Sequence, residues 1–224
     1  MTTFWPQGTV YGSLLNFQAE IAAMGGQVHA APYQAPPVAP VLYVKTANTW
    51  SANGAVVALP PGASQLEVGA TIAMVIGAPV FDTQTSRAHS SVAGYVLVND
   101  LSVPHASFYR PPLKAKCPDG LFGVGPQCVP AAQAGDPARW VIEVCINGVL
   151  RHTADFYGLL RDAAALLADV SDFMTLQSGD WLLLGCAGGR PLVAAGDSVE
   201  IRVANRPEFG VLVNRLAEHT LVAA

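Results

Sequence analysis

The stretch Gly94-Tyr-Val-Leu-Val-Asn-Asp-Leu-Ser102 runs from β-branched, aromatic and other apolar residues into a polar cluster. Apolar residues of these kinds favour strands, so we predict a strand over residues 92–99 that ends at Asp100. The end of this strand therefore presents polar side chains.

The preceding segments predict further strands. Residues 8–16 and 41–45 are typical of strands, and residues 17–24 of a short helix. Residues 30–40 contain four prolines, which exclude a helix or a central strand. Residues 67–77 begin with alternating polar or small side chains and end apolar, which predicts a strand that leaves a site and enters the core.

The second half of the chain combines a hairpin with a helix. Asn147-Gly148 is a strong turn signal between two apolar runs, and it predicts a β-hairpin. Apolar residues at helical spacing predict one long helix over residues 156–173, with Asp155 as its N-cap. Strands outnumber helices without strict βαβ order. We therefore predict one α+β domain over residues 1–224, with a mixed, largely antiparallel sheet.

Composition excludes several classes of protein. The net charge of −4 argues against a nucleic-acid surface, and 51% hydrophobic residues permit a large core. The first 44 residues contain no Lys or Arg, and the apolar stretch 68–81 is too short to span a bilayer. The four cysteines show no zinc spacing. We expect a cytoplasmic protein with free thiols that binds neither nucleic acid nor membrane.

Common catalytic motifs are missing from the sequence. It contains no nucleophile elbow, no Walker loop and no dinucleotide fingerprint. The glycine-rich segment 185–189 does not open an apparent helix, and the five histidines form no i, i+4 pair. Hydrolytic triads and phosphate cradles are therefore not indicated.

Two motifs together identify a family. The segment Gly94–Ser102, followed by Lys114-Ala-Lys-Cys-Pro-Asp-Gly120, resembles the fumarylacetoacetate hydrolase family, with its Asn-Asp-x-Ser strand end and Lys-x-x-Asp-Gly loop. Pro40-Val-Leu-Tyr-Val-Lys45 resembles the lysine-bearing strand of that family. The resemblance covers nearly the whole chain. It implies β-sheets that form a partly open barrel or roll.

The segment Ser107–Lys116 points to one branch within this family. It resembles the first unit of the isomerase/decarboxylase branch that serves 4-hydroxyphenylacetate (homoprotocatechuate) degradation, where two such units are fused or occur as separate subunits. The resemblance implies action on 5-oxopent-3-ene-1,2,5-tricarboxylate and 2-hydroxyhepta-2,4-diene-1,7-dioate. A homologous partner subunit or a homodimer is implied with it.

The family holds Mg²⁺ or Mn²⁺ with three carboxylates, and the metal stabilises the enolate that decarboxylation and isomerisation build. The resemblance places the first two ligand positions at Gly69 and Thr71, which carry no carboxylate, and the third at Asp100. We therefore expect a degenerate metal site. Glu67, one pleat before Gly69, is the candidate substitute ligand if a bulge brings it nearer.

Other site residues follow from the same resemblance. Lys116 and Asp100 are expected at catalytic positions, although Asp100 is also a candidate to pair with Lys116. Asp119 is expected to form a turn. The candidate substrate-binding residues are Lys45, Arg110 and Asn99. Two positions carry a different residue from the family: Glu20 stands in place of a histidine base, and Cys186 in place of a threonine.

Three functions remain open at this point. The first is a subunit that pairs with a homologous chain bearing all three carboxylates. The second is a self-sufficient metal-dependent homodimer that uses Asp100 and Glu67. The third is a non-catalytic subunit that binds a small acid or serves assembly.

Overall fold

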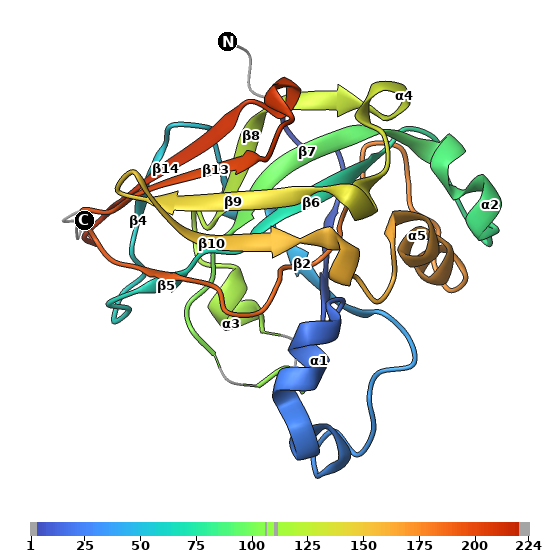
Figure 1. The fold of residues 1–224 in the computed structure, drawn as a ribbon, viewed down its shortest axis with the longest axis horizontal. Coiled ribbons are helices and arrows are strands. Elements are labelled where there is room, and N and C mark those ends of the chain that lie inside the picture. Colours follow the sequence, from blue (N-terminus) through green and yellow to red (C-terminus); the bar gives the residue numbers. More distant parts are fainter. Residues whose placement is uncertain (1–3, 106, 110–111, 220–224) are drawn as a thin grey trace.

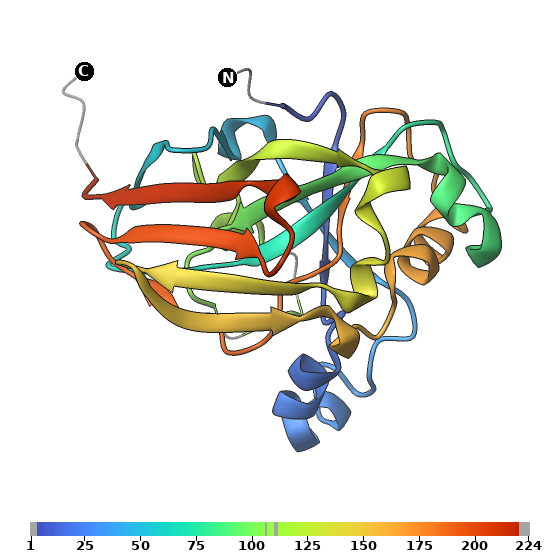
Figure 2. The ribbon, with the colours of Figure 1, turned by 45° about the horizontal axis from the view of Figure 1, so that its top comes forward.

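The computed structural model describes residues 4–105, 107–109 and 112–219. A five-stranded sheet lies across one face of a seven-stranded sheet, which curls into an open half-barrel (Figures 1 and 2). The larger sheet has the order β2-β1-β11-β6-β7-β8-β3 and the smaller one β10-β9-β13-β14-β4, while β12 and β5 form a separate pair. The strands are β1 Val10–Leu14, β2 Val41–Lys45, β3 Trp50–Ser51, β4 Val56–Ala58, β5 Leu66–Glu67, β6 Ala70–Ile76, β7 Val92–Asp100, β8 Phe122–Pro130, β9 Val141–Ile146, β10 Val149–Asp155, β11 Trp181–Leu183, β12 Leu192–Val193, β13 Ser198–Val203 and β14 Val211–Ala217.

The sheets are mixed and mainly antiparallel, as the sequence predicts. In the described part of the chain, β1–β11, β3–β8 and β4–β14 are parallel pairs, and the remaining ladders are antiparallel. The predicted hairpin is confirmed between β9 and β10, with positive φ at both Asn147 and Gly148. Such angles at both central residues match the twist of the flanking strands.

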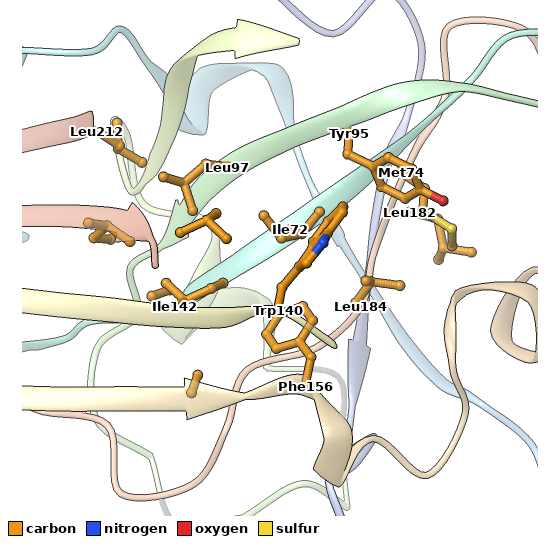
Figure 3. Packing of buried hydrophobic residues seen from close by; sticks show 14 of the residues in the cluster. Ile72, Met74, Tyr95, Leu97, Trp140, Ile142, Phe156, Leu182, Leu184 and Leu212 are labelled. Atoms are coloured by element: carbon orange, nitrogen blue, oxygen red, sulfur yellow. The ribbon is translucent and has the colours of Figure 1, made fainter. Parts of the chain in front are cut away.

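The main core lies between the two sheets (Figure 3). Ile72 and Leu97 from the large sheet face Ile142 from the small one, and all three are fully buried. Trp140 closes one end of this core. Its ring packs edge-on against Tyr95, with ring centroids 5.2 Å apart.

Helices are short and peripheral. The α-helices are α1 Gln18–Met24, α2 Thr85–Ala88, α3 Leu113–Lys116, α4 Ala131–Ala134 and α5 Ala163–Ser171, and 3-10 turns include Gly25–His29 and Phe156–Gly158. Helix α1 lies outside the two sheets at one end of the molecule (Figure 1). None of the helices in the described ranges has the length and hydropathy needed to cross a membrane.

The prediction of one helix over residues 156–173 is wrong. Asp155 caps only the 3-10 turn, and Asp162 caps α5 by accepting a hydrogen bond from the Ala165 backbone. Between them, Leu160 donates its backbone N–H to the carbonyl of Asn16. This long-range backbone pairing holds the intervening segment extended, and it overrides the helical pattern.

Candidate active site

The end of strand β7 places a fully buried carboxylate between two ammonium groups. Lys45 Nζ lies 3.0 Å from Asp100 Oδ1, and Lys116 Nζ lies 2.5 Å from Asp100 Oδ2. The Tyr43 hydroxyl donates a hydrogen bond to the same Oδ2. We call these four residues the Asp100 cluster.

Local structure explains how the cluster assembles. Tyr43 and Lys45 are two residues apart on β2, so their side chains point to the same face. Helix α3 ends at Lys116, whose side chain contacts Oδ2 of Asp100. Lys45 also donates hydrogen bonds to the backbone carbonyls of Leu101, at 3.2 Å, of Leu121, at 3.0 Å, and of Lys116. Three backbone acceptors therefore match the three donors of this buried ammonium group.

The charges of the cluster are mutually dependent. Burial raises the pKa of Asp100, but Lys116 and Lys45 lower it more, so the pKa lies well below its usual range. Burial lowers the pKa of Lys45, and Asp100 opposes that shift only in part. For Tyr43, burial and the neighbouring carboxylate raise the pKa well above its ordinary value. Asp100 is consequently an ionised carboxylate whose charge is already compensated.

Gly69 and Thr71, where we expect the first two metal-ligand positions of the family, leave no room for a carboxylate side chain. A Cβ at Gly69 would lie 2.2 Å from the backbone oxygen of Asp100, so no side chain fits without a backbone shift. Thr71 is fully buried, and its hydroxyl donates a hydrogen bond to the Gly185 carbonyl. Neither position offers an anionic oxygen.

Glu67, the candidate substitute ligand, has a different partner. Its Oε2 lies 3.4 Å from Arg190 Nη2 and 3.5 Å from the Ser102 hydroxyl. Within the described ranges, no three His, Cys, Asp or Glu side chains gather in an arrangement that could hold a metal ion. The donor set around Asp100, one carboxylate with two bound cations, does not fit Mg²⁺ or Mn²⁺.

The remaining predicted residues lie in varied places. Asn99 lies on the opposite face of β7 from Asp100, where its amide donates to Asn214 across the sheets at 3.0 Å. Asp119 is bonded to the Asn48 amide at 2.6 Å. Arg110 lies outside the described residues.

Two charged residues near the Asp100 cluster, Glu20 and Arg190, are largely buried, which the sequence alone does not indicate. Glu20 on α1 is 8% exposed, and burial is the main cause that raises its pKa to about 7. Arg190 follows the glycine-rich segment, and its side chain is 10% exposed. No motif marks Arg190, because its carboxylate neighbours Glu20, Glu67 and Asp100 come from segments at least 90 residues away in the sequence. Burial is likewise the main cause that raises the pKa of Cys186 to about 12, so this thiol is neutral.

This fold and these motifs match a known family. The family model for the fumarylacetoacetate (FAA) hydrolase C-terminal domain matches residues 9–217, and the chain belongs to this family. The 4-hydroxyphenylacetate degradation bifunctional isomerase/decarboxylase of Salmonella dublin is 35% identical over 201 residues, which are 90% of this chain and 46% of that protein. The homoprotocatechuate catabolism bifunctional isomerase/decarboxylase of Escherichia coli is 34% identical over 87% of this chain and 44% of that protein. The chain thus spans less than half the length of these relatives.

Solved structures agree on the fold. The 5-carboxymethyl-2-hydroxymuconate delta-isomerase of Mycobacterium smegmatis superposes with a TM-score of 0.78 at 27% identity, covering 95% of this chain and 79% of that one. The fumarylpyruvate hydrolase of Pseudomonas aeruginosa, solved with Mn²⁺ and pyruvate, gives a TM-score of 0.80 at 23% identity and covers 95% of this chain and 90% of that one. The predicted family and fold class are confirmed.

Proposed function

We propose that this chain is a subunit of an isomerase/decarboxylase that acts on small unsaturated oxo-diacids in aromatic catabolism, and that it binds no divalent metal of its own. The observation that carries this proposal is the Asp100 cluster: Lys45 and Lys116 contact both oxygens of the carboxylate. A divalent ion at Asp100 would have to displace at least one buried ammonium group and would meet the repulsion of the other.

The relatives support a role in a two-unit assembly. They are bifunctional enzymes more than twice as long as the matched region, which leaves room for a second unit of similar size beside the one that resembles this chain. We infer that a homologous unit with all three carboxylates supplies the metal-dependent chemistry. This chain then contributes assembly surface and a cationic site for the acid.

Metal titration of the isolated chain tests the first half of the proposal. Calorimetry with Mg²⁺ and Mn²⁺ is expected to detect no site tighter than about 1 mM, since fewer than three anionic oxygens converge. A chain from the same family with all three carboxylates is the positive control. A single site of micromolar affinity on this chain would refute the proposal.

Reconstitution tests the second half. When the chain is mixed with a homologous unit that keeps its carboxylates, we expect a complex on a sizing column and decarboxylase activity above that of the partner alone. If no complex forms and the partner's activity is unchanged, the subunit role is wrong.

A further inference from the structure

Arg190 has donors that the chain itself does not use. Among the residues that the structure describes, its side chain makes one ion pair, with Glu67 at 3.4 Å, and no hydrogen bond. A guanidinium carries five N–H donors. Arg190 has no side-chain nitrogen that is fully buried and also lacks a hydrogen-bond partner. Its remaining N–H donors therefore reach solvent-accessible space. A nine-tenths buried arginine with open donors is suited to a planar, two-oxygen anion.

Glu20 lies against the loop that carries this arginine. Its methylene stem packs near Gly188, 3.7 Å from where a Cβ would stand, two residues before Arg190 in the chain. The Glu20 side chain lies in the first turn of α1 and is only 8% exposed.

The charges around Glu20 decide its protonation. Arg190 and Lys116 favour the ionised form, Glu67 opposes it, and Cys186 is neutral. With Asp100 and Lys45 included, three carboxyl groups face three cations, so the region is neutral when Glu20 is ionised. It is positive by one charge when Glu20 is protonated. A bound anion restores neutrality only in the protonated state.

We propose that Arg190 binds a carboxylate of the substrate and that Glu20 takes up a proton when this anion binds. The carboxylate accepts two hydrogen bonds from the guanidinium, and the proton on Glu20 removes the repulsion between two neighbouring anions. The identity of the acid, a small oxo-diacid, rests on the proposed function. The site itself does not require that function.

Calorimetry with fumarate tests this site on the isolated chain in a buffer with chelator. Titrations near pH 7.5 in two buffers of different ionisation enthalpy are expected to show uptake of up to one proton per bound fumarate. Because uptake accompanies binding, affinity is expected to fall about tenfold between about pH 6.5 and pH 8. Binding without proton uptake would overturn the role of Glu20.

Three variants separate the residues. Arg190→Gln is expected to weaken fumarate binding at least tenfold, and Arg190→Lys to weaken it less while proton uptake persists. Glu20→Gln removes the titratable group at nearly constant side-chain volume, so it is expected to bind fumarate with no proton uptake and no dependence on pH. Arg202→Gln is the control, because Arg202 pairs with Glu143 on the small sheet. Fumarate binding that survives Arg190→Gln unchanged would refute the site.

The failure of this proposal is distinguishable from failure of the proposed function. Micromolar Mg²⁺ or Mn²⁺ binding would refute the metal-free subunit while leaving proton-linked fumarate binding intact. Thermal unfolding of each variant shows whether it folds. If Arg190→Gln does not fold, Arg190→Lys and Glu20→Gln still decide the outcome.

Discussion

The backbone carbonyl of Asp100 fills the space that a side chain at Gly69 would need. A Cβ there would lie 2.2 Å from that oxygen, and the Asp100 N–H in turn donates to the Gly69 carbonyl at 2.8 Å. The segment between β5 and β6 approaches the end of β7 closely at this point because glycine has no side chain. The backbone geometry at Gly69, as well as the residue type, therefore opposes a carboxylate side chain at this predicted ligand position.

Alanine at position 69 tests this close approach. We expect Gly69→Ala to lower the free energy of unfolding by about 1–3 kcal/mol or more, since the added methyl forces the strands apart. Gly26→Ala is the matched control: a Cβ there meets nothing within 4 Å. Urea denaturation measures both. Equal stability of the two variants would contradict the close approach, and Gly69→Glu is expected to disrupt folding rather than rebuild a metal site.

Removal of the Asp100 carboxylate leaves two buried ammonium groups without their counter-ion. We expect Asp100→Ala to cost about 3–5 kcal/mol in the free energy of unfolding. Asp169→Ala is the control, because Asp169 is 46% exposed in its pair with Arg161 and such pairs contribute about 1 kcal/mol or less. Similar losses in both variants would show that the Asp100 cluster is not the buried ion network described above.

The stability of the chain should depend on pH through Glu20. Burial raises the pKa of Glu20 from 4.5 to about 7. The stabilising contribution of protonated Glu20 to the free energy of unfolding is therefore complete below pH 4.5 and is lost as pH rises through 7. The shift corresponds to roughly 3 kcal/mol. Glu20→Gln removes this loss, so we expect the variant to gain roughly 3 kcal/mol relative to the parent chain between about pH 4.5 and pH 8. A constant difference between the two proteins across that range would refute the raised pKa.

The Thr71 hydroxyl provides a fourth test. Thr71→Val keeps the shape but leaves the buried Gly185 carbonyl without its donor, at an expected cost of about 1–3 kcal/mol. Thr153→Val on β10 is exposed and should change stability by less than about 0.5 kcal/mol. Denaturant midpoints measure both variants. No difference between them would mean that the Thr71 bond contributes nothing.

Local pattern predicted the strands and the hairpin because alternation and turn chemistry act over a few residues. It failed for residues 156–173, where a hydrogen bond from Leu160 to Asn16 overrides helical spacing. The family resemblance located Lys45, Asp100 and Lys116, which the structure brings together. Arg190 escaped prediction because its partner Glu67 lies 123 residues away in the sequence, and no local pattern encodes that contact.

The parallel pairing of β1 with β11 constrains the order in which this protein can fold. Val10 pairs with Trp181 in that ladder, and among the described strands β11 alone links β1 and the edge strand β2 to the rest of the large sheet. On the ribosome, the β1–β2 ribbon must therefore wait until most of the polypeptide has emerged before it can dock. Because Tyr43 and Lys45 lie on β2 of that ribbon, we expect the buried ion network to be completed late in folding.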